Sequence, residues 1–308
     1  MKKNFSANGK LLLTAEYLVL EGALALALPV RFGQKMSVTE NSSSEIKWSS
    51  LDHKDELWFS ASFSLYDFKA TETTDEEIAA RITKLLKGCA RQDSEFLSQW
   101  KGQKVETKLE FDRKWGLGTS STLVYCIAEW ADVNPYQLLM DTFGGSGYDI
   151  ACAGADGPVL YSLRDYAISV EESLFYPSFR NNLFFIYSGR KQNSQAAVKD
   201  FQRLKNFSTK DIDTASELTE SFEKCTNLHD FKKLITEHEL LISKILKTSP
   251  MKNEYFHDFE GEIKSLGAWG GDFILAATES DKKYVTEYFT GKGLTDFFSY
   301  DDLILKRK

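Results

Sequence analysis

The chain has 308 residues, 42% of them hydrophobic and 13% aromatic, so it is long enough to form two domains with packed cores. Its net charge is −7 at pH 7 and its pI is about 5.3, with lysines interspersed along the sequence. A nucleic acid or an anionic membrane needs a clustered basic surface, so neither is expected as a partner, whereas a small anionic ligand is compatible with this charge.

The N-terminal segment has only a superficial likeness to a secretion signal. Lys2 and Lys3 precede an apolar region, but Glu16 and Glu21 interrupt it. The longest clean apolar run, residues 22–30, is far below the roughly 20 residues that span a bilayer. We therefore expect a soluble, cytoplasmic protein.

Alternation of apolar and polar residues predicts a strand-rich start, with a turn around Glu21 and Gly22 joining a pair of strands. The strands expected here are 5–13, 23–32, 35–40, 45–49 and 57–65. Residues 75–89 predict a helix, with Thr74 as its cap and apolar residues on one face. Helices are also expected at 136–142 and from residue 148 to 153.

A strand at 159–163 is followed by a polar stretch, and we place a domain boundary near residue 178. The elements expected beyond it are strands at 183–187, 273–277 and 302–305, and helices at 194–205, 211–226, 228–246 and 282–290.

Cysteine and histidine spacing indicates neither a disulfide framework nor a metal site. We expect buried free thiols at Cys89, Cys126, Cys152 and Cys225. We expect surface positions for His53, His229, His238 and His257.

The most informative segment runs from residue 104 to residue 133. It begins with a strictly alternating strand whose apolar face carries Val105, Thr107, Leu109 and Phe111. The glycine loop Gly-Leu-Gly-Thr-Ser-Ser follows at 116–121 and leads into an apolar helix at 122–133.

This arrangement favours an anion site, because glycines let a ligand approach the main chain and a helix start attracts phosphate. Thr119, Ser120 or Ser121 can cap the helix. The alternative interpretation is a capped strand-to-helix turn that binds nothing. The loop is neither a Walker motif nor a dinucleotide fingerprint, since Ser121 stands where the latter needs its third glycine.

Further glycine clusters occur at 144–147 and 267–271, and three ordered motifs of the chain resemble those of the GHMP small-molecule kinases. This family includes galactokinase, homoserine kinase, mevalonate kinase and phosphomevalonate kinase. Residues 7–20 are similar to its opening segment, with Asn8 for the usual proline and Ala15 for the usual glycine. Residues 116–121 are similar to its phosphate loop, and 267–272 to its third motif, with Trp269 in place of a glycine.

Between these motifs, residues 145–151 read Gly-Ser-Gly-Tyr-Asp-Ile-Ala, which resembles phosphomevalonate kinases and a bacterial GYDIA-type subgroup of the family. Tyr17, where mevalonate kinases tend to carry histidine, agrees with that subgroup. Residues 188–194 look like the substrate-side loop of phosphomevalonate kinases. Arg190 and Lys191 are candidates there for binding an anionic substrate group, or are solvated loop charges.

The resemblance implies a role for each matching residue. Asp149 orients or deprotonates the acceptor, and Lys10 keeps that carboxylate ionised and stabilises the transferred group. ATP binding is implied for Gly116, Leu117, Gly118, Thr119, Ser120 and Ser121. Substrate binding is implied for Gly147, Tyr148, Ser188, Gly189, Lys191, Ser194, Gly267, Ala268 and Gly270.

Ser120 is the implied Mg²⁺ ligand. Leu138 stands near the position where mevalonate kinases supply a glutamate to the metal, and Asp141 is the nearest acid.

The implied fold is α+β, with an N-terminal ATP-binding domain at 1–178 that has a mixed sheet and a glycine-rich phosphate loop, and a C-terminal ferredoxin-like domain at 179–308. The implied activity is ATP- and Mg²⁺-dependent phosphoryl transfer to a small acidic metabolite, phosphomevalonate or mevalonate, in isoprenoid precursor synthesis. The expected partner is this small-molecule substrate, and the expected state is a monomer or homodimer.

Other interpretations stay open. The related diphosphomevalonate decarboxylase matches less well in its serine loop. Another GHMP-type sugar or amino-acid kinase and a non-catalytic ATP and metabolite sensor on the same fold are the remaining alternatives.

Overall fold

The computed structural model describes residues 2–165, 167–190, 194–267, 269 and 271–307. They form two compact units, each built from several stretches of sequence. Unit 1 comprises Met1–Gly9, Phe32–Arg113 and Leu117–Gly154, and unit 2 comprises Lys10–Arg31, Lys114–Gly116 and Ala155–Lys308. The sequence-based domain limits, 1–178 and 179–308, stay a prediction.

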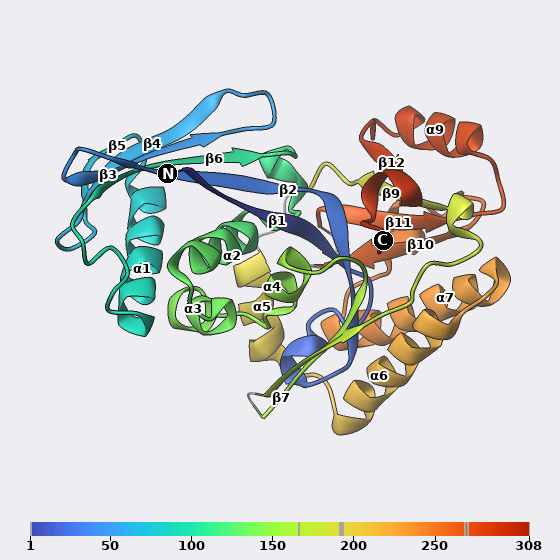
Figure 1. The fold of residues 1–308 in the computed structure, drawn as a ribbon. Helices are drawn as coiled ribbons and strands as arrows, with labels where there is room; N and C mark the ends of the chain where they lie inside the picture. The colour runs from blue at the N-terminus through green and yellow to red at the C-terminus, as the bar shows by residue number, and fades with distance from the viewer. Residues whose placement is uncertain (1, 166, 191–193, 268, 270, 308) are drawn as a thin grey trace. The chain divides into compact units, whose positions relative to one another are not determined.

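Unit 1 contains a mixed β-sheet with the strand order β5–β4–β3–β6–β2 (Figure 1). β3 and β6 are parallel, and the other neighbours in this order are antiparallel. β1 pairs with β2, and both strands continue into unit 2. The strands are β1 Lys2–Leu12, β2 Ala25–Asn41, β3 Glu45–Leu51, β4 Leu57–Ser64, β5 Ala70–Thr73 and β6 Gly102–Leu109.

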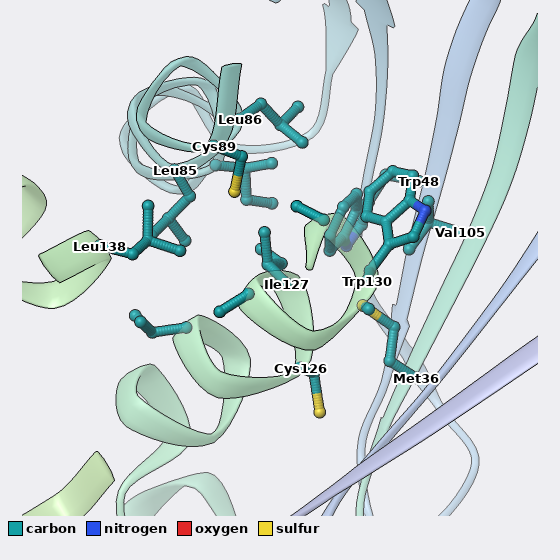
Figure 2. Close-up of a cluster of buried hydrophobic side chains, with 14 of the residues drawn as sticks. Met36, Trp48, Leu85, Leu86, Cys89, Val105, Cys126, Ile127, Trp130 and Leu138 are labelled. Carbon is teal, nitrogen blue, oxygen red and sulfur yellow. The ribbon is translucent and has the colours of Figure 1, made fainter. Parts of the chain in front are cut away.

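Helices cover one face of this sheet (Figure 1). They are α1 Glu76–Gln92, α2 Thr119–Ala131, α3 Pro135–Thr142 and α4 Tyr148–Ala153. The core between sheet and helices joins Trp48 and Val105 of the strands to Leu86, Ile127 and Leu138 of the helices (Figure 2). This burial explains why the alternating segment forms a strand, since each second residue enters the core.

The cap of α1 differs from the prediction. Asp75, rather than Thr74, caps this helix by accepting a hydrogen bond from the Ile78 N–H at 3.0 Å. The Thr74 hydroxyl is already engaged with the backbone of Ser60, from which it accepts one bond and to which it donates another. A residue held by a neighbouring strand cannot serve the helix start as well.

Unit 2 contains an antiparallel sheet with the strand order β10–β11–β9–β12. Its strands are β9 Leu183–Tyr187, β10 Glu262–Leu266, β11 Phe273–Ala277 and β12 Phe297–Ser299. The strand β7 Val159–Arg164 pairs with the first part of β2, and β8 Ala167–Glu172 pairs with β7. The helices are α5 Ser194–Leu204, α6 Thr209–Lys224, α7 Leu228–Leu246, α8 Met251–Tyr255, α9 Lys282–Gly291 and α10 Tyr300–Leu303.

The predicted α+β fold class is confirmed, with a large mixed sheet and a second, small antiparallel sheet. The expected strand at 302–305 is wrong, because Ser299 caps a short helix, α10, by accepting from the Asp302 N–H. Within that stretch, Ile304 makes a single antiparallel bridge, to Val30. Four further strands, β5, β8, β10 and β12, were not predicted, because they are short, polar or exposed.

The predicted free thiols are confirmed, and three of them, Cys89, Cys126 and Cys152, are buried. Cys225 is only half-buried. In the described part of the chain, every helix is too short or too polar to cross a membrane.

Substitution of Ile127 tests the core that anchors α2. Ile127 is fully buried, and its replacement by alanine is expected to lower the free energy of unfolding by about 2–5 kcal/mol, because apolar contacts are lost and a cavity remains. Chemical denaturation measures this change. Lys87→Ala on the exposed side of α1 is the control, and equal stabilities of the two variants would contradict the packing described here.

Candidate functional site

The glycine loop at 116–121 leads into α2 earlier than expected. The helix begins at Thr119, with Gly118 as its N-cap at φ 98°, so the predicted start at residue 122 is wrong. Capping by Thr119, Ser120 or Ser121 is wrong too, since no side chain of the described residues caps this turn. The Ser121 hydroxyl instead donates to the Gly118 carbonyl at 2.9 Å. The first-turn amides therefore lack the side-chain acceptor that a capped turn has.

The loop is fixed on one side and accessible on the other. Leu117 is fully buried, and the Thr122 hydroxyl, also buried, donates to Gln34 Oε1 at 2.7 Å. Ser120 is exposed. The loop therefore presents Ser120 and the helix start to solvent from a rigid base.

Asp149 lies in the first turn of α4, whose N-cap is Gly147 at φ 90°. α4 packs directly against α2 within unit 1. The packing is close enough that a Cβ atom on Gly154 would lie 2.3 Å from the Tyr125 hydroxyl. Asp149 is half-buried, and its Oδ1 accepts from the Ile150 N–H at 3.2 Å. The helix that carries Asp149 and the helix that follows the glycine loop are thus direct neighbours.

The structure also locates the residues considered as a further metal ligand. Leu138 is fully buried in the core of unit 1, so its position cannot present a ligand to a surface site. Asp141 is exposed on α3, where its Oδ1 accepts from Gln137 Nε2 at 2.7 Å. Among the residues with described positions, no group of three or more His, Cys, Asp or Glu side chains could hold a metal ion.

In unit 2, residues from all three motifs meet at Gly116. The Lys10 ammonium donates to the Gly116 carbonyl at 3.0 Å. Asp272 lies so close to the same residue that a Cβ atom on Gly116 would be 1.8 Å from Asp272 Oδ2. Gly116 also has φ 66°, a conformation that glycine adopts at little cost. The structure therefore brings together Lys10, Gly116 and Asp272, which are far apart in sequence.

The predicted substrate-side loop adjoins the third glycine cluster. The Ser188 hydroxyl donates to the Gly271 carbonyl at 2.7 Å, and the Ser188 N–H donates to the Asp272 carbonyl at 2.8 Å. The Arg190 guanidinium lies 3.9 Å from the centre of the Tyr255 ring. Gly189 follows Ser188 in an exposed position. Lys191, Ala268 and Gly270 lie outside the described residues, as does the side chain of Ser194, the first residue of α5.

Trp269, in the third glycine cluster, is buried within unit 2, with 8% of its surface exposed. The main-chain N–H of Trp269 donates to the Tyr17 hydroxyl at 3.2 Å, and the Tyr17 ring stacks on the Phe201 ring with centroids 5.3 Å apart. Ala15 and Tyr17 have φ of 61° and 63°. Ala15 thus occupies a left-handed conformation that glycine would adopt at lower cost.

The sequence analysis missed a buried ionic cluster in unit 2, formed by Glu16, His238, Glu239 and Lys264. Lys264 Nζ lies 2.5 Å from Glu16 Oε1 and 3.7 Å from Glu239 Oε1. His238, predicted at the surface, is fully buried, and that prediction is wrong. A charged residue in an otherwise ordinary strand or helix carries no sequence signal that tells burial from exposure.

Comparison with known proteins identifies the fold. No protein-family model matches the chain, and no curated protein matches it by sequence. Its structure is similar to that of the mevalonate kinase of Methanococcus jannaschii, with a TM-score of 0.70, 15% identity and coverage of 99% of both chains.

Two further structures are similar. Streptococcus pneumoniae phosphomevalonate kinase, in complex with phosphomevalonate and AMPPNP, has a TM-score of 0.70 at 16% identity, over 96% of this chain and 99% of its own. Lactococcus lactis galactokinase, complexed with galactose, has a TM-score of 0.71 at 12% identity, over 99% of this chain and 93% of its own. At such identities the likeness concerns the fold, and the chain has the two-domain α+β fold of the GHMP-family kinases.

Proposed function

We propose that the chain is an ATP-dependent GHMP-type small-molecule kinase that phosphorylates a small acidic metabolite, phosphomevalonate or mevalonate. The observation that carries the proposal is the packing of α4, with Asp149 in its first turn, against α2, whose start has no side-chain cap. Phosphoryl transfer needs an anion site beside a carboxylate that faces the acceptor, and these two helices supply both groups.

The start of α2 is suited to the phosphates of a nucleotide. Its N–H groups and the positive end of its dipole favour negative charge, and Gly118 lets an oxygen approach the main chain. Binding there is proposed for Gly116, Leu117, Gly118, Thr119, Ser120 and Ser121. The similar phosphomevalonate kinase was crystallised with AMPPNP, which supports ATP as the nucleotide.

Mg²⁺ fits the donor set at this helix start. The metal usually takes few protein oxygens and completes its shell with phosphate oxygens and water. The exposed Ser120 hydroxyl is such an oxygen and stands beside the first-turn amides. When bound, the metal would neutralise charge on the phosphates.

Asp149 and Lys10 are the proposed catalytic residues. A half-buried carboxylate can accept the proton of an alcohol acceptor, or orient a phosphate acceptor that is already anionic. Lys10 brings a positive charge to Gly116, the first residue of the phosphate loop, and suits the charge that collects on a transferred phosphoryl group. An electrostatic effect of Lys10 on Asp149 stays a prediction.

Acceptor binding is proposed for the residues that the family resemblance marks. Tyr148 and Gly147 adjoin Asp149 at the start of α4. Ser188 and Gly189 lie next to the third glycine cluster, which begins with Gly267. The same role is proposed from sequence alone for Lys191, Ser194, Ala268 and Gly270.

An ADP-release assay with Mg²⁺-ATP and a panel of acceptors tests this function. We expect turnover with phosphomevalonate or mevalonate and little with galactose or homoserine. Turnover with galactose or homoserine alone would support a kinase function but contradict the proposed substrate. ATP binding without turnover of any acceptor would contradict the kinase and favour a sensor.

Asp149→Asn tests the proposed acid–base residue. The variant should lose turnover by about 10²–10⁴-fold, because it cannot accept a proton or hold a negative charge. Binding of AMPPNP, measured by calorimetry, should be retained. Asp141→Asn on the exposed side of α3 is the matched control and should keep normal rates. Near-normal turnover of Asp149→Asn would remove the residue from the mechanism.

Ser120→Ala tests the proposed metal ligand. The Mg²⁺ concentration for half-maximal rate should rise about tenfold or more, since a lost bond to a charged group costs about 1.5–3 kcal/mol. A magnesium titration of ADP release at fixed ATP measures the shift. Ser120→Thr keeps the hydroxyl and should restore most of the metal affinity, and an unchanged magnesium dependence of the alanine variant would exclude a ligand role.

A further inference from the structure

The buried ionic cluster of unit 2 plays no part in the chemistry described so far. Its members come from three places in the chain: Glu16 follows β1, His238 and Glu239 lie on α7, and Lys264 lies on β10 (Figure 1). Their side chains are at most 5% exposed. Removing charges from water is unfavourable, and apolar residues of similar size often stabilise a core better. Stability is therefore a weak explanation for this cluster.

The cluster joins two backbone segments that lead to the candidate site. Glu16 stands between Ala15 and Tyr17, whose left-handed conformations need support from the surrounding structure. His238 Nε2 accepts the Ala15 N–H at 2.9 Å. On the other segment, Glu239 accepts bonds from the N–H and the hydroxyl of Ser265, the residue after Lys264. The strand β10 then enters the loop that carries Trp269 and Asp272.

Each of the two segments has one end at the buried cluster and the other end at Gly116. The first segment runs from Lys10, which donates to the Gly116 carbonyl, to Glu16, which pairs with Lys264. The second segment runs from Lys264 to Asp272, which lies against Gly116. The Glu16–Lys264 pair therefore ties the segment that follows Lys10 to the strand that precedes Asp272 in the sequence.

We propose that Glu16, His238, Glu239 and Lys264 are positioning residues that fix Lys10 and Asp272 around Gly116, and that the ionisation of Glu239 makes phosphoryl transfer depend on pH. This inference rests on the proposed kinase function. It concerns buried residues that act through the main chain.

The balance of charge in the cluster gives the direction of the effect. Glu239 faces Lys264 and Ser265 on β10 and Glu16 in the segment after β1. His238, the preceding residue on α7, lies 3.2 Å from Glu16 and packs against Phe222 of α6. Burial raises the pKa of Glu239 to about 7 and also raises the pKa of Glu16, with Lys264 opposing both. Burial and the Lys264 charge hold the pKa of His238 well below its ordinary value, so its ring is neutral.

Lys264 lies closer to Glu16 than to Glu239, so its charge opposes protonation of Glu16 more strongly than protonation of Glu239. Ionisation of Glu239 above about pH 7 therefore adds one negative charge to the cluster. The folded-state pKa of Glu239 is about 7, and its ordinary value is 4.5. Protonation of Glu239 therefore contributes its full stabilisation of the folded state below pH 4.5, and this contribution is lost as pH rises to about 7.

Glu239→Gln tests the proposal, because glutamine keeps the size and the acceptor oxygen but does not titrate. Wild-type kcat should fall as pH rises through about 7, while KM for ATP stays within about twofold. The variant should lose this inflection in kcat and should melt at a higher temperature than the wild type above pH 7. Glu237→Gln, an exposed carboxylate on the same helix, is the matched control and should keep the wild-type profile.

Coincident pH profiles of kcat for the wild type and Glu239→Gln would overturn the positioning role and leave the kinase function intact. A wild type that releases no ADP with any acceptor would overturn the proposed function, and with it this inference. Hydrogen exchange of the wild type keeps the test independent of the variant's folding. Protection of residues 13–18 should fall as pH rises through about 7, and a constant protection would contradict the proposal.

Discussion

The missing side chain at Gly116 is the constraint on which the rest of the candidate site in unit 2 depends. A Cβ atom there would lie 1.8 Å from Asp272 Oδ2, so no other residue could stand at this point without moving the third motif. The carbonyl of the same glycine holds the Lys10 ammonium at 3.0 Å. Gly116 thus contacts the Lys10 ammonium of the first motif and lies against the Asp272 carboxylate of the third. Three motifs that are far apart in the sequence therefore meet at one backbone position.

The site is built on conformations and buried charges that a core designed for stability alone would avoid. Ala15 and Tyr17 have positive φ angles, which are unfavourable for side chains other than glycine. The Glu16–Lys264 pair is fully desolvated beside a second buried carboxylate, that of Glu239. The fully buried strand β11 and the aromatic stacking of Tyr17 on Phe201 offset such costs nearby.

Much of the fold could be predicted because its signals are local. The alternation around Val105 identified β6, and the glycine loop identified the junction with α2. The predicted helix caps were wrong where the hydroxyl group forms another hydrogen bond. The Thr74 hydroxyl donates to a carbonyl of the neighbouring strand β4, and the Ser121 hydroxyl donates to the Gly118 carbonyl. His238 and Lys264 could not be recognised, since their burial depends on tertiary contacts between α7, β10 and the segment after β1. The Gly116–Asp272 contact likewise follows from the fold and not from spacing.

A crystal structure with Mg²⁺ and AMPPNP tests the central claim most directly. The account predicts β- and γ-phosphate oxygens within hydrogen-bonding distance of the main-chain amides at the start of α2, a metal at the Ser120 hydroxyl, and the Asp149 carboxylate facing the terminal phosphate. Phosphates bound elsewhere, or an Asp149 carboxylate remote from the terminal phosphate, would contradict it.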